Sequence, residues 1–331
     1  MTVAKLKTIT LQINTAPTDN RFLRSLLKHQ ISVLGNQVNE IHITADIRPS
    51  RKGRFHFSDE QITEFKQILE DVEQQYDKAV VHYVDYSDEA IKEVAQEIWG
   101  RDSLPVKDYR GGPFYSYIYG LHRAETDYVF HLDSDIFLGG GHPDWCSNAI
   151  ELLKDDPEIA IIKPLSGPPM KDRSAPHQFG EPLFPYQDLA AAFFSDNFTT
   201  RVYLTEKKRL TGILKEITLD KPDLLRSLIG RWQRNPAVKT PAQLLSDYLA
   251  KTEYCRLDYL GAEPGLWTLH PPFRSEEFYS KLDDIIEAVE NNKVPDAQRG
   301  HYDINHAFVD WSSAIDNLPV YRRKKARQRF Q

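Results

Sequence analysis

Residues 127–138 read DYVFHLDSDIFL, an apolar run typical of a buried strand that ends in two aspartates, Asp133 and Asp135. Gly139, Gly140 and Gly141 follow directly and leave the backbone free to turn. Ligands of open parallel sheets bind at the carboxyl ends of the strands. We therefore expect the two aspartates to lie at a functional edge of a sheet.

Strand and helix patterns alternate on both sides of this segment, which indicates an α/β fold with a mostly parallel sheet flanked by helices. The patterns predict strands at 7–13, 40–45, 79–84, 159–164, 200–204 and 256–260, and helices at 20–34, 58–76, 89–99, 114–123, 145–153, 223–233, 241–251 and 275–290. Prolines punctuate the stretch after residue 165, which we interpret as an ordered excursion of the same domain.

The composition is that of an ordinary globular protein, with 40% hydrophobic and 27% charged residues in 331. No apolar run is long enough for a spanning helix, and no signal-peptide pattern follows Met1, so a cytoplasmic location is expected. The two cysteines, Cys146 and Cys255, are too few for a disulfide scaffold and are interpreted as structural thiols.

Charge is unevenly distributed along the chain. The net charge is -6, but residues 321–331 carry six basic groups and no acid, which leaves -12 on the remainder. Because residues 1–320 carry this net negative charge, which phosphates would repel, the sequence argues against a nucleic-acid partner. The basic tail has two interpretations, a solvated terminus or a peripheral contact with anionic lipid.

Two carboxylates separated by one residue converge only where the backbone turns between them. Mg2+ and Mn2+ take one or two carboxylates and fill their other positions with water and phosphate oxygens, so such a pair can bridge a protein to a diphosphate. Asp-Ser-Asp is also common in exposed turns. The strand before Asp133 and the glycines after Asp135 favour the metal-binding interpretation.

The strings HLDSDIFLGG and YRGGPFYSYIYGLHRAETDYVFHLDSD resemble the D-x-D region of GT-A-fold glycosyltransferases, especially those similar to family 2. The resemblance extends from Lys7 to about Ser275. It implies one Rossmann-like GT-A domain over 1–320 with a C-terminal acceptor-side extension. Within it, 1–138 would be the nucleotide-sugar-binding half and 139–320 the acceptor half with the C-terminal helices, followed by the basic tail 321–331.

The resemblance also implies a set of site residues. Asp133 would meet the ribose or the metal, Asp135 would bind the metal directly, and His270 in WTLHPPFRS would complete the metal shell. Arg274 could reach the leaving diphosphate or serve only in a surface salt bridge. The base and ribose would be held by Thr15, Ala16, Pro17 and Asp46. Arg110, at the head of the Gly-Gly turn, is either a contact to the base or phosphate or a solvated loop residue. After Ala45 the chain departs from the family's D-D-G-S string.

An inverting transfer needs a carboxylate base near the acceptor hydroxyl. Where the family commonly has a Glu-Asp pair at a helix start, this chain has Pro241, Ala242 and Gln243. Asp247, one turn further on, is our first choice, with Asp196 and Asp188 as alternatives. The stereochemical outcome stays open.

The sequence therefore predicts a glycosyltransferase that uses Mn2+ or Mg2+ and a nucleotide-sugar donor, with UDP favoured over GDP. The resemblance implies a glycan or lipid-linked acceptor in bacterial surface polysaccharide synthesis, with the enzyme in the cytoplasm or at the inner face of the membrane. Two alternatives are a catalytically inactive GT-A-like scaffold and a haloacid-dehalogenase-type phosphatase, whose D-x-D normally lies near the start of its core. P-loop, dinucleotide-binding and nucleophile-elbow strings are absent from the sequence.

Overall fold

The structure is a computed structural model that describes residues 9–50, 56–176, 183–187 and 189–318. Its strands are β1 (Ile9–Thr15), β2 (Glu40–Ala45), β3 (Ala79–Tyr83), β4 (Tyr128–Asp133), β5 (Phe137–Gly139), β6 (Ile159–Ser166), β7 (Phe184–Pro185), β8 (Ala192–Ser195), β9 (Val202–Glu206), β10 (Cys255–Tyr259) and β11 (Trp267–Leu269). The basic tail predicted at 321–331 lies outside the described residues.

The α-helices are α1 (Asn20–Leu34), α2 (Asp59–Gln75), α3 (Asp88–Val94), α4 (Tyr115–Arg123), α5 (Trp145–Asp155), α6 (Lys207–Glu216), α7 (Leu224–Trp232), α8 (Pro241–Leu249) and α9 (Glu276–Glu290). A π-helical turn (Ala95–Trp99) extends α3, and a 3-10 turn (Pro17–Asp19) precedes α1. None of the helices in the described ranges is both long and apolar enough to span a bilayer.

A single sheet forms the centre of the molecule, with the strand order β3-β2-β1-β4-β9-β6-β10-β8-β7. The first four strands are parallel to one another, and β6 and β10 are parallel as well. β9 lies antiparallel between β4 and β6, and β8 and β7 add an antiparallel edge. The predicted α/β class with a mostly parallel sheet is confirmed.

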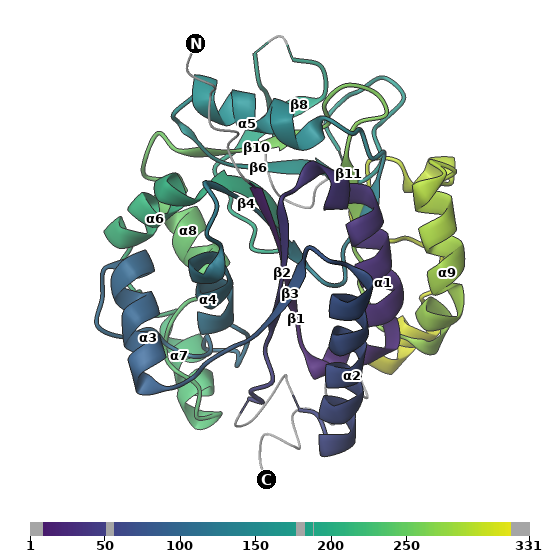
Figure 1. Cartoon of the computed structure of the whole chain (residues 1–331). Coiled ribbons are helices and arrows are strands. Elements are labelled where there is room, and N and C mark those ends of the chain that lie inside the picture. Colours follow the sequence, from purple (N-terminus) through teal and green to yellow (C-terminus); the bar gives the residue numbers. More distant parts are fainter. Residues whose placement is uncertain (1–8, 51–55, 177–182, 188, 319–331) are drawn as a thin grey trace.

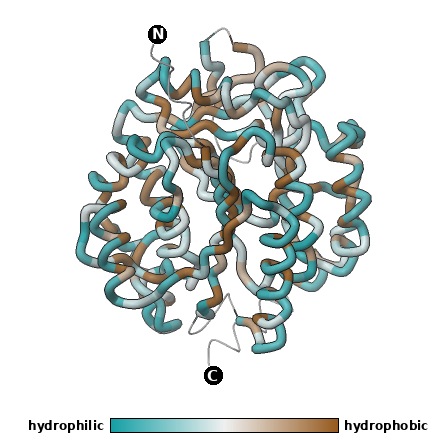
Figure 2. Tube along the Cα trace, in the orientation of Figure 1, coloured by the Kyte–Doolittle hydropathy of each residue, from teal (hydrophilic) through white to brown (hydrophobic). Residues whose placement is uncertain are grey.

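Helices cover both faces of the sheet, with α1, α2 and α9 on one side and α3, α4, α6 and α8 on the other (Figure 1). Hydrophobic residues are concentrated along the central strands, whereas the outer helices are largely hydrophilic (Figure 2). One buried cluster joins α1 and α2 to the sheet, a second joins α4 and α6 to it, and a third holds α9. This two-sided burial explains the continuous apolar runs in the strands.

The parallel register brings the ends of three strands to one edge of the sheet. Thr15 at the end of β1 pairs with Ala45 at the end of β2. Asp46, the next residue after Ala45, therefore lies close to the end of β1. On the other side of β1, Asn14 pairs with Asp133. The two aspartates therefore lie at the carboxyl edge of the parallel strands, as expected, together with the ends of β1 and β2.

The glycine run after Asp135 has a packing role. β5 pairs antiparallel with β11, opposing Gly139 to Trp267. A Cβ atom on Gly139 would overlap the Trp267 ring, so only glycine allows this close approach. The pairing holds β11 beside the D-x-D turn, and His270 is the first residue after β11.

Candidate functional site

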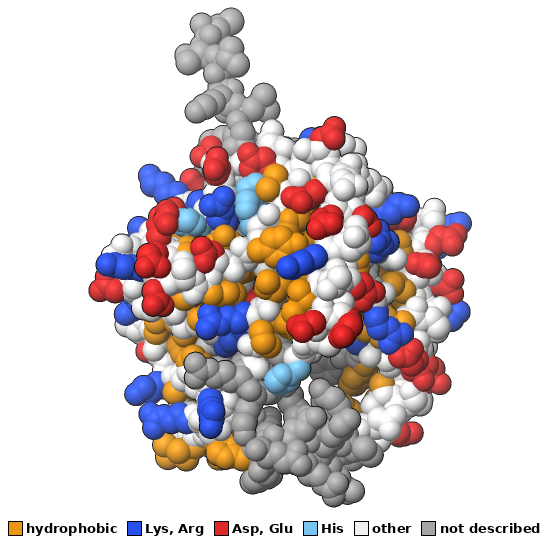
Figure 3. Space-filling model, turned by 60° about the horizontal axis from the view of Figure 1, so that its bottom comes forward, with side chains coloured by type: hydrophobic (Ala, Val, Ile, Leu, Met, Phe, Trp, Pro, Cys, Tyr) orange, Lys and Arg blue, Asp and Glu red, His pale blue; other side chains and the backbone are white. Residues whose placement is uncertain are grey.

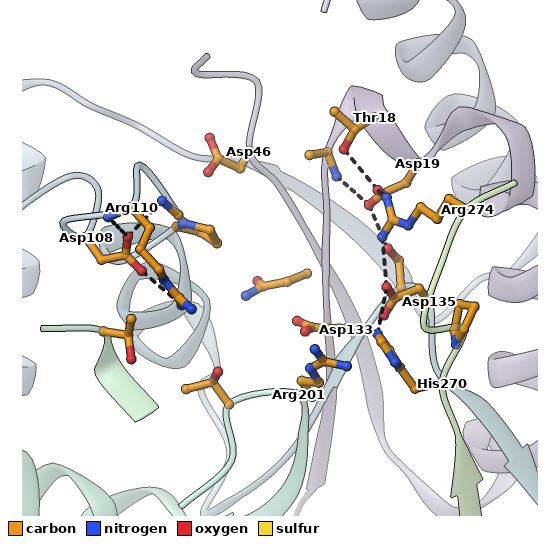
Figure 4. Close-up of a pocket in the computed structure, with 18 of the residues that line it drawn as sticks. Thr18, Asp19, Asp46, Asp108, Arg110, Asp133, Asp135, Arg201, His270 and Arg274 are labelled. Atoms are coloured by element: carbon orange, nitrogen blue, oxygen red, sulfur yellow. Dashed lines mark hydrogen bonds and ion pairs between the residues drawn. The ribbon is translucent and has the colours of Figure 1, made fainter. Parts of the chain in front are cut away.

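A cavity of about 1220 Å3 opens at the carboxyl edge of the parallel strands. Its wall includes most of the residues that the sequence singled out, namely Thr15, Ala16, Asp46, Arg110, Asp133, Asp135, His270 and Arg274. Figure 4 shows six of them, Asp46, Arg110, Asp133, Asp135, His270 and Arg274, around one open space. Pro17 is buried in its 3-10 turn and is not part of the cavity wall.

Asp135 lies at the centre of a charged cluster. Arg274 Nη2 donates to Asp135 Oδ2 at 2.8 Å, and Arg274 Nη1 donates to Asp19 Oδ1 at 2.8 Å. His270 Nε2 is 3.6 Å from Asp135 Oδ2. Burial by itself would raise the pKa of the Asp135 carboxyl, but His270 and Arg274 hold it below its usual range. Asp135 is therefore ionised.

The orientation of His270 is set by two neighbours. Its Nδ1 is 3.0 Å from Asp303 Oδ1, and its ring stacks on Tyr302 with 5.6 Å between the ring centroids. A carboxylate beside one imidazole nitrogen orients the ring, and in a metal complex the other nitrogen would be the electron-pair donor. His270 thus presents Nε2 toward Asp135 and the cavity.

Asp133 is held separately, on the opposite side of the D-x-D turn (Figure 4). Tyr117 Oη donates to Asp133 Oδ1 at 2.9 Å, and burial together with this carboxylate raises the pKa of Tyr117 well above its usual value. The backbone N–H of Asp133 donates to the carbonyl of Arg201 at 2.7 Å. Burial disfavours the charge on Arg201, but Tyr302, Asp135 and Asp133 more than offset this and raise its pKa.

The loop between β1 and α1 is organised by Asp19. Its Oδ2 accepts hydrogen bonds from Thr15 Oγ1 at 3.2 Å, the Ala16 N–H at 3.1 Å and Ser134 Oγ at 2.8 Å. Asp19 is buried and therefore needs these donors together with the Arg274 guanidinium. It ties the loop after the first strand to the D-x-D turn.

At the far side of the cavity, Asp46 is held by two side chains. Lys107 Nζ donates to its Oδ2 and Tyr86 Oη to its Oδ1, each at 2.7 Å. Arg110 has a half-exposed side chain on a tight loop, which Asp108 fixes by accepting the Arg110 and Gly112 N–H groups at 2.7 and 2.9 Å. Arg110 lines the cavity, and its guanidinium also pairs with Asp108 Oδ2 at 3.4 Å.

The structure does not bring Asp247 to the cavity wall. Its carboxylate accepts from Lys239 Nζ at 2.6 Å on the exposed side of α8. Thr240, Pro241 and Ala242 do line the cavity, and Thr240 caps α8 with Gln243 in a reciprocal capping box. Residues 240–243 therefore form the start of α8 and supply no carboxylate to the cavity. Asp196 is exposed and away from the wall, and Asp188 lies outside the described residues.

We tested whether these side chains fit a divalent cation. Asp135 and His270 are close enough to share one ion, and the Asp303 contact is the support that a ligating histidine normally has. Across the described ranges, however, no group of three His, Cys, Asp or Glu side chains is arranged as a metal site. Two of the three predicted ligands are assembled, while Asp133 is turned toward Tyr117.

Sequence reasoning missed Asp19, Arg201 and Asp303. Asp19 carries a usable signal, because it follows directly on the loop after the first strand. Arg201 and Asp303 carry none, since their function depends on β9 lying beside β4 and on Asp303 pairing with His270.

Comparison by sequence finds no match, either to a protein-family model or to a curated protein. By structure, the chain is similar to S. aureus TarS with a TM-score of 0.37 and 13% identity, covering 88% of this chain and 41% of TarS. It is also similar to LgtC, with a TM-score of 0.35 and 10% identity over 75% of this chain and 72% of LgtC.

A third similar structure is the glucosyl-3-phosphoglycerate synthase of Mycobacterium tuberculosis, in complex with Mn2+, UDP and phosphoglyceric acid. Its TM-score is 0.26 at 13% identity, over 48% of this chain and 43% of the synthase. This chain spans about two fifths of the length of TarS. Similarity at this level does not assign an activity, and the α/β class rests on the strand order itself.

Proposed function

We propose that this protein is a GT-A-type glycosyltransferase that moves a sugar from a nucleotide-diphosphate sugar to a carbohydrate acceptor. The observation that carries the proposal is the D-x-D turn at the end of β4, which opens into a large cavity together with His270 and the guanidinium of Arg274. An ionised Asp135 that could hold a cation, beside the Arg274 guanidinium, suits a site that binds a diphosphate.

A divalent cation, Mn2+ or Mg2+, fits the donor set formed by Asp135 and His270, with Asp133 as a further carboxylate on the same turn. When bound, such an ion supplies Lewis-acid stabilisation of the departing diphosphate. The chain's own arginines serve the same end. Arg274 and Arg201 provide fixed positive charge at the D-x-D turn and could bind phosphate oxygens in a bidentate manner.

The nucleoside would occupy the part of the cavity between the β1 loop and Asp46. Thr15 and Ala16 line this region, and Pro17 supports the loop from beneath. Arg110, on its rigid loop, supplies a cation on the other side. We propose a UDP-sugar in preference to a GDP-sugar as the donor.

We propose a glycan or lipid-linked acceptor from bacterial surface polysaccharide synthesis, with the enzyme working at the inner face of the membrane. The basic tail, residues 321–331, would fit a contact with anionic lipid there. The catalytic base of an inverting reaction would have to be a carboxylate that reaches the cavity, and Asp247, paired with Lys239, is not part of the cavity wall.

The test is isothermal titration of UDP and GDP into the metal-stripped protein, with and without Mn2+. We expect one nucleotide to bind in a Mn2+-dependent manner, and expect Asp135→Asn to abolish that dependence. The matched control is Asp247→Asn, which removes a carboxylate outside the cavity wall and should bind as the unchanged protein does.

A catalytically inactive scaffold is the second candidate, favoured by Arg274 already occupying Asp135 and by the lack of a complete three-ligand group in the described part of the chain. The same titration separates the two. If neither nucleotide binds to the folded protein in the presence of Mn2+, the transferase proposal is wrong.

A further inference from the structure

Helix α7 exposes an unusual amount of apolar surface. Large hydrophobic side chains on this nine-residue helix are exposed by 78% at Leu224, 68% at Leu225, 53% at Leu228, 36% at Ile229 and 45% at Trp232. At about 100° per residue, these five side chains fall within an arc of about 140°. They therefore form one continuous face. Exposed apolar clusters of this kind mark interaction surfaces.

The opposite face of α7 is the one that packs on the protein. Ser227 and Gly230 are buried, and a Cβ atom on Gly230 would lie 3.0 Å from the Tyr109 carbonyl oxygen. Asp223 caps the helix by accepting the Arg226 N–H at 2.9 Å. The helix is thus anchored through this face, and its leucines point away from the protein.

Basic side chains border the apolar face. On the same helical projection Arg226 and Arg231 lie on its two sides, and Lys221 and Arg234 flank the helix ends. Arg226 also forms an exposed ion pair with Asp223 at 3.2 Å. Leucine and tryptophan between arginines are the composition of helices that lie in the interface of an anionic bilayer.

The position of α7 relates this surface to the site. The helix lies at the end of the molecule to which the parallel strands run (Figure 1). Arg226 and Ile229 line the cavity, and so does Leu318, the last described residue. Figure 3 is turned toward this end, where hydrophobic side chains lie next to Lys and Arg side chains.

We propose that α7 docks the protein onto an anionic phospholipid membrane, with Leu224, Leu225 and Leu228 inserted among the lipids and the flanking arginines on the headgroups. The basic side chains around the apolar face of α7 favour an anionic membrane over the other possible partners. The chain's own C-terminal residues share its positive charge and would be repelled, and two copies of α7 face to face would bring their arginines together. The inference adds a docking element to the membrane location proposed above and does not depend on sugar transfer.

The test uses the full-length protein and flotation with vesicles of phosphatidylcholine alone or mixed with phosphatidylglycerol. We expect binding to the mixed vesicles that weakens with salt, and much weaker binding to phosphatidylcholine alone. The triple variant Leu224→Ser, Leu225→Ser, Leu228→Ser should lower the partition coefficient about tenfold or more. Arg231→Gln should lower binding to the mixed vesicles only.

The matched control is Val80→Ser, which removes an exposed apolar side chain from β3 and should leave vesicle binding unchanged. Nucleotide titration on the triple variant, compared with the unchanged protein, separates loss of docking from loss of the donor site. Equal vesicle binding by the triple variant and the unchanged protein would overturn the proposal. So would absence of binding to anionic vesicles, or a dimer in sedimentation that the triple variant abolishes.

Discussion

Arg274 and Asp135 are 139 residues apart in sequence, yet Arg274 Nη2 lies 2.8 Å from Asp135 Oδ2. The other guanidinium nitrogen holds Asp19, so one side chain joins the loop after β1, the D-x-D turn and the segment after β11. These three segments carry the acids and the imidazole of the site. Arg274 therefore holds these three segments together.

Replacing Arg274 by glutamine should lower both stability and nucleotide affinity, because Asp19 and Asp135 would lose their shared cation. Since the Arg274 side chain is 35% exposed, we expect a loss of about 1–2 kcal/mol in the free energy of unfolding, less than for a fully buried pair. Urea unfolding measures this change in the free energy of unfolding. Arg21→Gln, which removes an exposed ion pair with Glu276, should change little. Equal losses of stability in Arg274→Gln and Arg21→Gln would contradict the role assigned to Arg274.

The contact between Asp303 and His270 predicts a role in metal binding. Asp303→Ala should weaken Mn2+ binding about 10–100-fold, because the imidazole would lose the carboxylate that orients it. Titration of Mn2+ into the metal-free protein measures this change in affinity. Asp310→Ala removes a carboxylate from the exposed surface near His306 and serves as the control. Unchanged Mn2+ affinity in Asp303→Ala would contradict this role of Asp303.

His82 should make the protein less stable in mild acid. Burial, with further contributions from His42 and Arg123, lowers the pKa of His82 from 6.5 to about 4. Between these values the unfolded chain binds a proton that the folded protein does not, so stability falls as the pH falls from 6.5 toward 4. The full shift corresponds to about 3 kcal/mol, and partial exposure reduces our expectation to about 1–2 kcal/mol.

The measurement is the free energy of unfolding at several values of pH across this window. His82→Gln should flatten the decrease, whereas His306→Gln, which alters an exposed imidazole, should leave it as it is. A decrease of the same size in all three proteins would assign the acid sensitivity to other groups.

Two glycines in helices should respond in opposite directions to alanine. A Cβ atom on Gly120 of α4 would lie 2.5 Å from Gln12 Nε2, so Gly120→Ala should cost about 1–3 kcal/mol as the helix shifts away from β1. Gly212 of α6 has no atom within 4 Å of the same position, and Gly212→Ala should stabilise by about 0.5–1 kcal/mol. Thermal unfolding of both variants tests the packing, and stabilisation by Gly120→Ala would refute it.

Much of the local structure could be predicted from the sequence because periodicity reports what each segment buries. The predicted helix at 58–76 forms as α2, and the reason is visible in the residues: Ser58 caps it and Gln61 returns a hydrogen bond to the cap. The helix α6 was missed. Its segment, KKRLTGILKE, follows β9 without a break and contains a glycine, so its pattern is weak.

By itself, the sequence determined the alternation of strands and helices and the position of the two aspartates at a strand end, since both follow from neighbouring residues. Only the tertiary structure decided that antiparallel β9 lies against β4 and carries Arg201 to the D-x-D turn. The tertiary structure also pairs Asp247 with Lys239 and leaves the leucines of α7 exposed. These outcomes depend on contacts between segments far apart in the chain, which a local pattern does not encode.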